Sequence, residues 1–364
     1  MTAEIVSFSA SEILLFSLAT LLVSGFFATI LPGFERKIHA RIQQRIGPPL
    51  LTPGFWSILK FAYKKRIKPN SPSPMFYHSF VLVSLSSVTF ILLFSTPYWW
   101  GVLGFGSLFA IVGLLKVEEI MYLFMGNFSN SVMSSKLPYP DQVTGAKFEN
   151  AKRGSIESQG AQRALKMVTI GSFPMYLAMF IPFVMVASIA VGDVVSMQNP
   201  VYSQLVASAK SVSAFDQFND SLEMLRNINP LILTLPGFLG AIIYFLGYNI
   251  ITNNRPFDII KPKVDIIEGP LMEYAAIWRA FVYILNAMLS FTMASLFVTF
   301  FIGIPLDIRL FIPFVFHLIL CFMLPAAAAI LRAFSPVLTF NQIYPVSIAA
   351  TVAGIVVIGL TYII

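Results

Sequence analysis

Three charged side chains inside an apolar run have the greatest potential for chemistry. Lys116, Glu118 and Glu119 occur in the segment GLLKVEEIMYLFMGNFSNS. Lys116 and Glu119 are three residues apart, so a helix would place them on one face. A charged side chain at the centre of a bilayer costs about 2.5–3.5 kcal/mol. We therefore expect the three residues to pair or to line a wet cavity, and we name them as possible ion-coupling residues. The alternative is that the apolar span ends near Leu115 and that they are interfacial.

The chain offers few other residues that could hold a metal or a redox centre. Its one cysteine, Cys321, lies in an apolar segment, which excludes disulfides within the chain and thiolate ligation of an iron–sulfur cluster. His39, His78 and His317 lie on different segments and share no metal-ligand spacing. There is no GxGxxG loop and no P-loop. We expect no catalytic, cofactor or metal site in this chain, so any electron carrier must belong to a partner.

The elements that position these residues are predicted to be membrane-spanning helices. Of the residues, 57% are hydrophobic and 11% are charged, against roughly a quarter charged in an ordinary soluble domain. Continuous apolar runs of about 20 residues favour helices over barrel strands. The predicted fold is an all-α polytopic protein, a single transmembrane domain over 1–364 with about eight spans. The spans are expected near 11–32, 77–97, 101–125, 165–191, 230–252, 274–302, 310–331 and 343–364.

The distribution of Lys and Arg predicts the orientation of the chain. Basic residues near the spans mark the cytoplasmic side. If successive spans alternate in direction, only Lys210, Arg226 and Arg309 of the 24 basic residues face outwards. Both termini are then outside. The predicted cytoplasmic segments are the loops 34–76, 126–163 and 253–273.

The first cytoplasmic loop contains a predicted amphipathic surface helix within FWSILKFAYKKRIKP. Helical spacing would put one set of apolar residues against a set of lysines, so the helix would lie on the membrane surface. The apolar set is Phe55, Ile58, Leu59, Ala62 and Tyr63, and the lysines are Lys60, Lys64 and Lys65. Such a basic surface can hold anionic lipid or an acidic partner domain. Composition alone does not choose between them.

A set of short motifs occurs in order along the chain. It comprises Glu35-Arg36-Lys37 with Gln43, Arg45, Gly47 and Pro48, then Pro53, Lys60 and Pro69, then Gly126 with Ser129-Asn130-Ser131, then Gly160-Ala161 with Arg163-Ala164, and finally Arg255-Pro256-Phe257-Asp258 with Gly269 and Glu273-Tyr274. Over about 35–290 this set resembles the H-type membrane subunit of respiratory complex I and its hydrogenase relatives. Arg255-Pro256 and Gly47-Pro48-Pro49 look closer to the antiporter-linked branch of membrane-bound hydrogenases and sulfane sulfur reductases.

The resemblance implies an eight-helix subunit with a long tilted first helix, in the plasma membrane of a prokaryote. It implies iron–sulfur and hydrogenase-like soluble-arm partners that carry the clusters, and antiporter-like membrane partners; no nucleic acid is expected. The function implied is anchoring of a ferredoxin-dependent, ion-translocating oxidoreductase. The residues expected to dock the soluble arm are Glu35, Arg36, Lys37, Arg41, Arg45, Arg255, Asp258, Asp265, Glu268 and Glu273.

The chain departs from the family pattern at its acidic positions. Six positions that carry acids in the family read Ser57, Lys65, Ser172, Lys261, Lys263 and Asn286. Serine and asparagine do not change protonation near neutral pH, so the usual carboxylate relay is not expected here. Two alternatives remain: the quinone-site subunit of a complex I-like enzyme, and a stand-alone ion transporter. The terminal electron acceptor and the coupling ion stay open.

The segment 134–159 is longer than the connection of a few residues that the family has there. Its two prolines, Gly145 and many polar residues predict a loop. It is either a variable surface insertion or a hook that grips a neighbouring soluble subunit.

Overall fold

A computed structural model describes residues 9–129, 156–202, 221–258 and 269–362, apart from 68, 70, 72, 101, 103 and 104. Within these ranges the chain is helical, and the only strand-like pairing is an isolated bridge between Ser107 and Ala190. The predicted all-α polytopic fold is confirmed. The inserted segment 134–159 lies largely outside the described residues, as do Lys210, Asp265 and Glu268.

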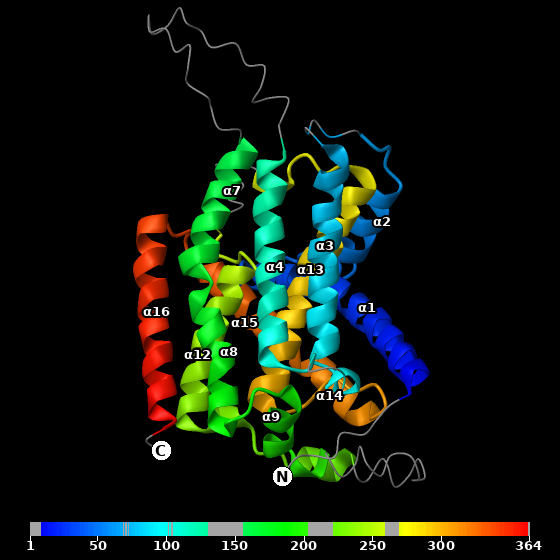
Figure 1. The fold of residues 1–364 in the computed structure, drawn as a ribbon. Coiled ribbons are helices and arrows are strands. Elements are labelled where there is room, and N and C mark those ends of the chain that lie inside the picture. Colours follow the sequence, from blue (N-terminus) through cyan, green and yellow to red (C-terminus); the bar gives the residue numbers. More distant parts are fainter. Residues whose placement is uncertain are drawn as a thin grey trace, which may run out of the picture.

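Long apolar helices make up the bundle (Figure 1). Their bounds are α1 Ala10–Ile42, α3 Pro74–Phe94, α4 Leu108–Asn127, α7 Ile156–Lys166, α8 Phe173–Val186, α12 Leu235–Ile251, α13 Ala276–Phe297, α14 Phe311–Leu320, α15 Met323–Phe334 and α16 Phe340–Leu360. Short elements join them: α2 Ser57–Ala62, α9 Val191–Gln198, the π-turns η1 Thr52–Trp56, η3 Met167–Gly171 and η6 Val298–Ile302, and the 3₁₀ turns η2 Pro97–Trp99, η4 Leu231–Leu233 and η5 Gly269–Leu271.

Six of these helical stretches are long and apolar enough to cross a membrane, and a bent pair that ends in α12 can form a seventh span. The helix α4 has the length of a span, but it carries Lys116, Glu118 and Glu119. The predicted spans therefore all correspond to helices, with shifted ends. For example, α4 begins seven residues later than predicted, and it runs on to Asn127 rather than ending near Leu115.

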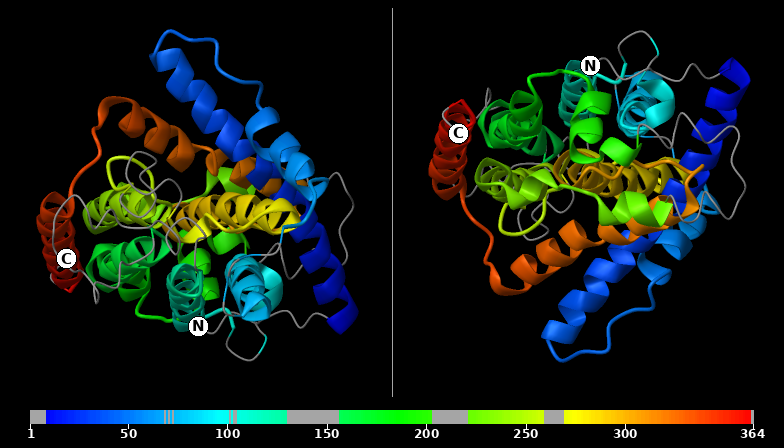
Figure 2. Two further views of the ribbon diagram at one scale, coloured as in Figure 1. Left: turned by 90° about the horizontal axis from the view of Figure 1, so that it is seen from above. Right: turned by 90° about the horizontal axis from the view of Figure 1, so that it is seen from below.

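The first helix is longer than its apolar run predicts. A capping box between Ser9 and Glu12 starts α1, and the helix continues ten residues past residue 32 to Ile42. Its 33 residues make it about 50 Å long, against about 30 Å for the hydrocarbon core. It crosses the bundle obliquely (Figures 1 and 2). The charged end of α1 stays helical because it packs against Ile330 of α15 and against the following loop at Gly47.

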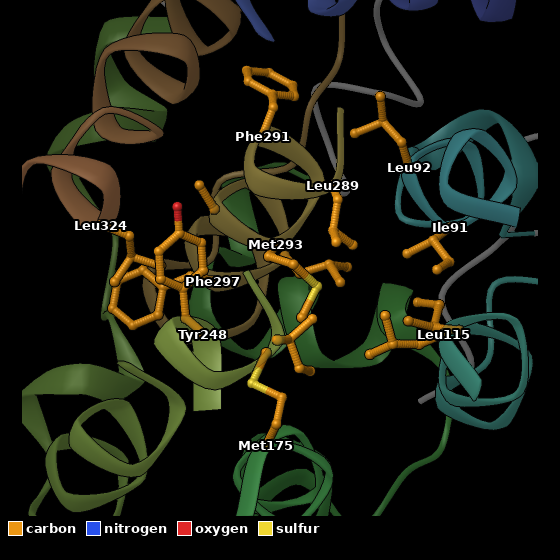
Figure 3. Packing of buried hydrophobic residues seen from close by; sticks show 14 of the residues in the cluster. Ile91, Leu92, Leu115, Met175, Tyr248, Leu289, Phe291, Met293, Phe297 and Leu324 are labelled. Carbon is orange, nitrogen blue, oxygen red and sulfur yellow. The ribbon is translucent and has the colours of Figure 1, made fainter. Parts of the chain in front are cut away.

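The central helix of the bundle is α13 (Figure 2). Its apolar window is 72% buried, whereas that of α16 is 22% buried. Figure 3 shows side chains of α13 packed against those of the helices around it. The residues labelled there are Ile91, Leu92, Leu115, Met175, Tyr248, Leu289, Phe291, Met293, Phe297 and Leu324. Because α13 touches most of the bundle, polar residues on it can join several helices.

The loop after α1 is seated on that helix through two glycines. A Cβ on Gly33 would lie 1.7 Å from the carbonyl oxygen of Leu50, and one on Gly54 would lie 1.8 Å from that of Thr29. Only glycine permits such approaches. The contact is reciprocal, since each segment supplies one glycine and one carbonyl.

The predicted amphipathic helix is short, and a ring outside its predicted apolar face docks it onto the bundle. It comprises only α2, preceded by η1, and α2 lies beside α13. The Phe61 ring stacks on Tyr283 at a centroid distance of 5.3 Å. Ala62 and Tyr63, which the pattern placed on the apolar face, are exposed. The docking of Phe61 onto a neighbouring helix fixes which side of α2 is covered, and this contact cannot be read from local spacing.

Successive spans run in opposite directions, with α7–α8 and α14–α15 each forming one span, so the described basic residues other than Lys116 separate between the two ends of the bundle (Figure 1). We define the basic end as the end at which α1, α4 and α12 finish; it carries Arg36, Lys37, Arg41, Arg45, Lys60, Lys64, Lys65, Arg66, Arg163, Lys166, Arg255, Arg279 and Arg332. Arg226 and Arg309 lie at the opposite end.

Candidate functional site

The two acids of α4 are buried within the bundle, and Lys116 beside them is half-buried. Glu118 is 5% exposed and Glu119 is 7% exposed. The amine of Lys116 donates to Glu119 Oε2 at 2.8 Å. The hydroxyl of Ser84, on α3, donates to Glu118 Oε1 at 3.3 Å. Lys116 and Glu119 thus form an ion pair. Glu118 and Glu119 also line a cavity, which is described below.

A π-turn in the neighbouring helix supplies further partners to Lys116. The amide of Ser172 donates to the carbonyl of Met167, five residues back, instead of to Val168 as in an α-helix. The Val168 carbonyl accepts from Lys116 Nζ at 3.1 Å and from Ser172 Oγ at 3.1 Å. Lys116 Nζ also lies 3.2 Å from Ser172 Oγ and 4.2 Å from the centroid of the Tyr176 ring. The turn η3 therefore fixes the amine of the half-buried lysine beside Glu119.

The two acids line an internal space that we call the inner cavity. Its walls come from α4, η3, α12 and α13, and its volume is about 40 Å³. Polar wall residues besides Glu118 and Glu119 are Ser172, Asn253 and Asn286. A space of this size with several polar groups can hold a water molecule or two.

A larger polar space, the outer cavity, adjoins the inner cavity towards the basic end. Its volume is about 270 Å³. The two cavities share wall residues Ile251, Asn253, Asn286 and Leu289, so they lie on either side of this group. The polar and charged residues that line the outer cavity are Glu35, Arg36, Thr252, Asn253, Asn254, Asp258, Arg279, Asn286, Ser290 and Arg332.

Charges of both signs face each other across the outer cavity. Glu35 lies within electrostatic range of Arg332 and Arg36. Tyr122, on α4, lines the inner cavity and lies within electrostatic range of Glu118, Arg279 and Asp258. The charges of the two cavities are therefore near one another around this phenol. A chain of ionisable and polar groups thus runs from the end of α1 to the middle of α4.

The turn after α12 forms one wall of both cavities. Asn253 has a positive φ of 53°, and the turn closes with Asn254 N donating to Asn249 O at 2.9 Å. Phe257 is 2% exposed and anchors the turn, while Asp258 reaches the outer cavity. The loop 253–273, which the sequence predicts to dock a partner, therefore begins in a turn fixed by hydrogen bonding and by the burial of Phe257.

The residues predicted to dock the soluble arm divide among three places. Glu35, Arg36 and Asp258 line the outer cavity. Lys37 and Arg41 line an apolar pocket on another side of α1. Arg45 and Arg255 are exposed, and both lie with Arg332 in electrostatic range of His39. Glu273 is half-buried and lines none of these spaces, and Asp265 and Glu268 lie outside the described residues.

Several residues of the cavities were not identified from the sequence. Arg279 is a cation inside the predicted span 274–302, and such a position could have marked it. Arg332 and Tyr122 reach the cavities only through contacts between distant helices, which leave no local signal. Ser172 and Asn286 are two of the positions at which the family pattern carries an acid, and both line the inner cavity beside Glu118 and Glu119.

Comparison with known proteins assigns the chain to a family. Residues 14–135 and 155–362 match the NADH dehydrogenase family, which leaves out 136–154, within the segment 134–159. The chain belongs to that family. An uncharacterized protein of Methanocaldococcus jannaschii is 38% identical over 90% of this chain and 92% of its own length. The H-type subunit of the NADH-quinone oxidoreductase of Carboxydothermus hydrogenoformans is 24% identical over 79% of this chain and 70% of its own length.

The NADH dehydrogenase family fold is also seen in a solved complex. A chain of the membrane-bound sulfane sulfur reductase, an archaeal respiratory membrane complex, superposes with a TM-score of 0.74 at 20% identity. The match covers 96% of this chain and 99% of that chain. The likeness therefore extends over the whole bundle, including the oblique first helix and the helices that line both cavities.

Proposed function

We propose that this chain is the membrane-anchor subunit of a ferredoxin-dependent, ion-translocating oxidoreductase of the hydrogenase or sulfane sulfur reductase type. An iron–sulfur arm docks at the basic end, and the chain couples electron transfer in that arm to ion movement in antiporter-like neighbours. The observation that carries the proposal is the pair of adjoining cavities, which leads from the basic end to Glu118 and Glu119 in the middle of α4.

The coupling is electrostatic. A unit charge about 10 Å away contributes roughly 1.7 kcal/mol at an effective dielectric constant of 20. That energy changes the proton occupancy of a carboxyl group more than tenfold. A change of charge in a docked arm acts first on Arg36 and Arg332 at the outer cavity. The altered field then acts on Glu118 past Asp258 and Arg279, which lie, like Glu118, within electrostatic range of Tyr122.

The exposed cations around His39 support the proposal that the basic end docks a partner. Arg45 and Arg255 come from loops 210 residues apart, yet both lie in electrostatic range of that histidine. The reciprocal glycine contact on α1 seats the first of these loops. Together they form a basic surface of fixed shape above the outer cavity, and an acidic partner is its natural complement.

The charged lining of the outer cavity favours an acceptor other than quinone. Ligand pockets are usually 300–1,000 Å³ and mostly apolar. The outer cavity is smaller and has Glu35, Arg36, Asp258, Arg279 and Arg332 on its walls. A quinone ring with its long apolar tail would have to desolvate several of these charges. The role of a quinone-site subunit is the second candidate, because a relative is named as part of an NADH-quinone oxidoreductase.

Purification of the intact complex tests the proposal. A tagged chain extracted in mild detergent should bring iron–sulfur and antiporter-like subunits with it. Reduced ferredoxin should then drive ion uptake into liposomes that contain the complex. Quinone-dependent oxidation of the donor, blocked by a tunnel-binding inhibitor, would support the second candidate instead. A chain that purifies alone and moves an ion by itself would show a stand-alone transporter and would refute both.

A further inference from the structure

The helix α1 presents two different faces at the basic end. Leu31, Pro32, Glu35 and Arg36 form a stripe along the outer cavity. A second stripe follows the spacing i, i+3, i+4, i+7 and i+8, which is one face of a helix. It consists of Phe34, Lys37, Ile38, Arg41 and Ile42. The second stripe has no part in the cavity that leads to α4.

The second stripe lines an apolar pocket of about 450 Å³. Leu50 and Ile330 complete its walls. Leu50 is held in place because its carbonyl is the group packed against Gly33. Phe34 is held by an edge-to-face contact with Phe322, at a centroid distance of 5.0 Å. The pocket is therefore built from fixed side chains of three segments.

The pocket is open to the surroundings of the protein and is basic at its rim. Leu50 is 39% exposed and Ile330 is 48% exposed. Among the described residues, no ion pair or side-chain hydrogen bond involves Lys37 or Arg41. Ile330 lies one turn before the end of α15, and α16 starts another span a few residues later. The pocket thus lies where the apolar part of the bundle meets its polar end.

We propose that this pocket binds one anionic membrane lipid. The hydrocarbon chain fills the space between Phe34, Ile38, Ile42, Leu50 and Ile330, and Lys37 and Arg41 hold the phosphate of the headgroup. An apolar groove with two cations at the membrane boundary is complementary to this ligand and to few others, because basic sites between membrane helices bind anionic headgroups. An acidic protein segment would match the two cations but would leave the apolar walls uncovered.

The lipid also separates two roles of the basic residues of α1. Arg36 faces the outer cavity and Arg45 is exposed in the following loop, so both remain available to a docked arm. Lys37 and Arg41 belong to the membrane. A bound lipid then fixes the height of α1 relative to the bilayer surface.

Lipid retention in the purified complex tests this proposal. The complex is extracted in mild detergent, exposed to phosphatidylglycerol or phosphatidylcholine, and analysed by native mass spectrometry. The wild type should retain phosphatidylglycerol, and inorganic phosphate should not compete with it. The double variant K37A/R41A should bind phosphatidylglycerol roughly 30-fold more weakly, which corresponds to about 2 kcal/mol. The matched control is K166A/R226A, which removes two exposed cations that do not line the pocket.

Two further variants separate the lipid from other causes. Ile330→Trp fills the pocket and leaves both cations in place, so it should also release the lipid. K37R/R41K keeps the charges and should retain it. The proposal is overturned if K37A/R41A binds lipid like the wild type, if K166A/R226A loses as much, or if Ile330→Trp has no effect. It is also overturned if K37A/R41A sheds the soluble arm while lipid binding is unchanged, because the pocket would then be a protein-docking site.

Discussion

Two groups of buried charges in this protein have opposite designs. At the opposite end from the cavities, Asp307 is fully buried and its carboxylate is saturated. Tyr98 donates at 2.8 Å, Tyr202 at 3.0 Å and Arg309 Nε at 2.9 Å, and Arg309 Nη2 is 2.5 Å away. None of these four residues lines either cavity. We call them the Asp307 cluster.

The phenols of the Asp307 cluster are also fixed in their protonation. Burial, and next the charge of Asp307, raises the pKa of Tyr98 well above its usual range. The same two causes raise the pKa of Tyr202. Both phenols therefore keep their protons at any physiological pH and remain donors.

The acids of α4 are arranged in a different way. Glu118 and Glu119 face a cavity large enough for water, and the cation beside them is shared with a backbone carbonyl and a hydroxyl. A saturated carboxylate can only hold the structure, whereas a carboxylate at the wall of a wet cavity can exchange a proton. The comparison is consistent with a structural role for the Asp307 cluster and with the ion-coupling role that we propose for α4.

Loss of the charge on Asp307 should have the largest effect on stability. Asp307→Asn leaves the buried Arg309 without its counter-ion, which costs about 3–5 kcal/mol. Equilibrium unfolding in mixed micelles would measure the change in the free energy of unfolding. Glu223→Gln, an exposed acid, is the control and should stay within about 0.5 kcal/mol. A change below about 1 kcal/mol in Asp307→Asn would remove the distinction between the two clusters.

Glu119→Gln should instead affect transport. We expect assembly and electron transfer in the soluble arm to be intact, and ion transport per electron to fall roughly a hundredfold, because a positioned proton-transfer group contributes at least that much. The measurement is ion uptake by liposomes set against donor oxidation. Glu118→Gln tests the second acid, and Glu223→Gln again serves as the control. Normal transport in both cavity variants would refute the role of α4.

Charge reversal at the docking surface should weaken assembly in a salt-dependent way. Arg45→Glu with Arg255→Glu should release the soluble arm at moderate salt, with binding roughly tenfold weaker, since exposed pairs contribute about 0.2–1 kcal/mol each and are screened over about 8–10 Å. Size-exclusion chromatography at increasing salt would measure release. Arg226→Glu, at the opposite end, should have no effect. Equal release by both variants would mean that net charge alone holds the arm.

The smallest expected effect is that of Ser172→Ala. It removes one hydroxyl shared by Lys116 and the Val168 carbonyl, so we expect a cost of about 1 kcal/mol or less and a few-fold loss of transport. Ser57→Ala is the matched control: it also stands at a family acid position and its hydroxyl also donates to a backbone carbonyl, but it lies outside the cavities. If the two variants behave alike, the hydroxyl of Ser172 has no special role.

The sequence predicts the helices better than it predicts the cavities. Apolar runs locate the spans because hydrophobicity is local, and the cost of buried charge singles out Lys116, Glu118 and Glu119. The apolar run of α1 ends near residue 32 but the helix continues to Ile42, because its last turns pack against α15 and the loop at Gly47 rather than depending on their own apolarity. The joining of the two cavities at Asn286 and the approach of Arg332 to Glu35 depend on contacts between helices far apart in the chain.

The reciprocal glycine contact has a mechanical consequence. Because Gly33 and Gly54 bring backbone against backbone, there is no side chain between α1 and its loop that could change rotamer and absorb a displacement. A force on the loop at the basic end therefore acts directly on the backbone of α1 at Thr29 and Gly33, on either side of Pro32.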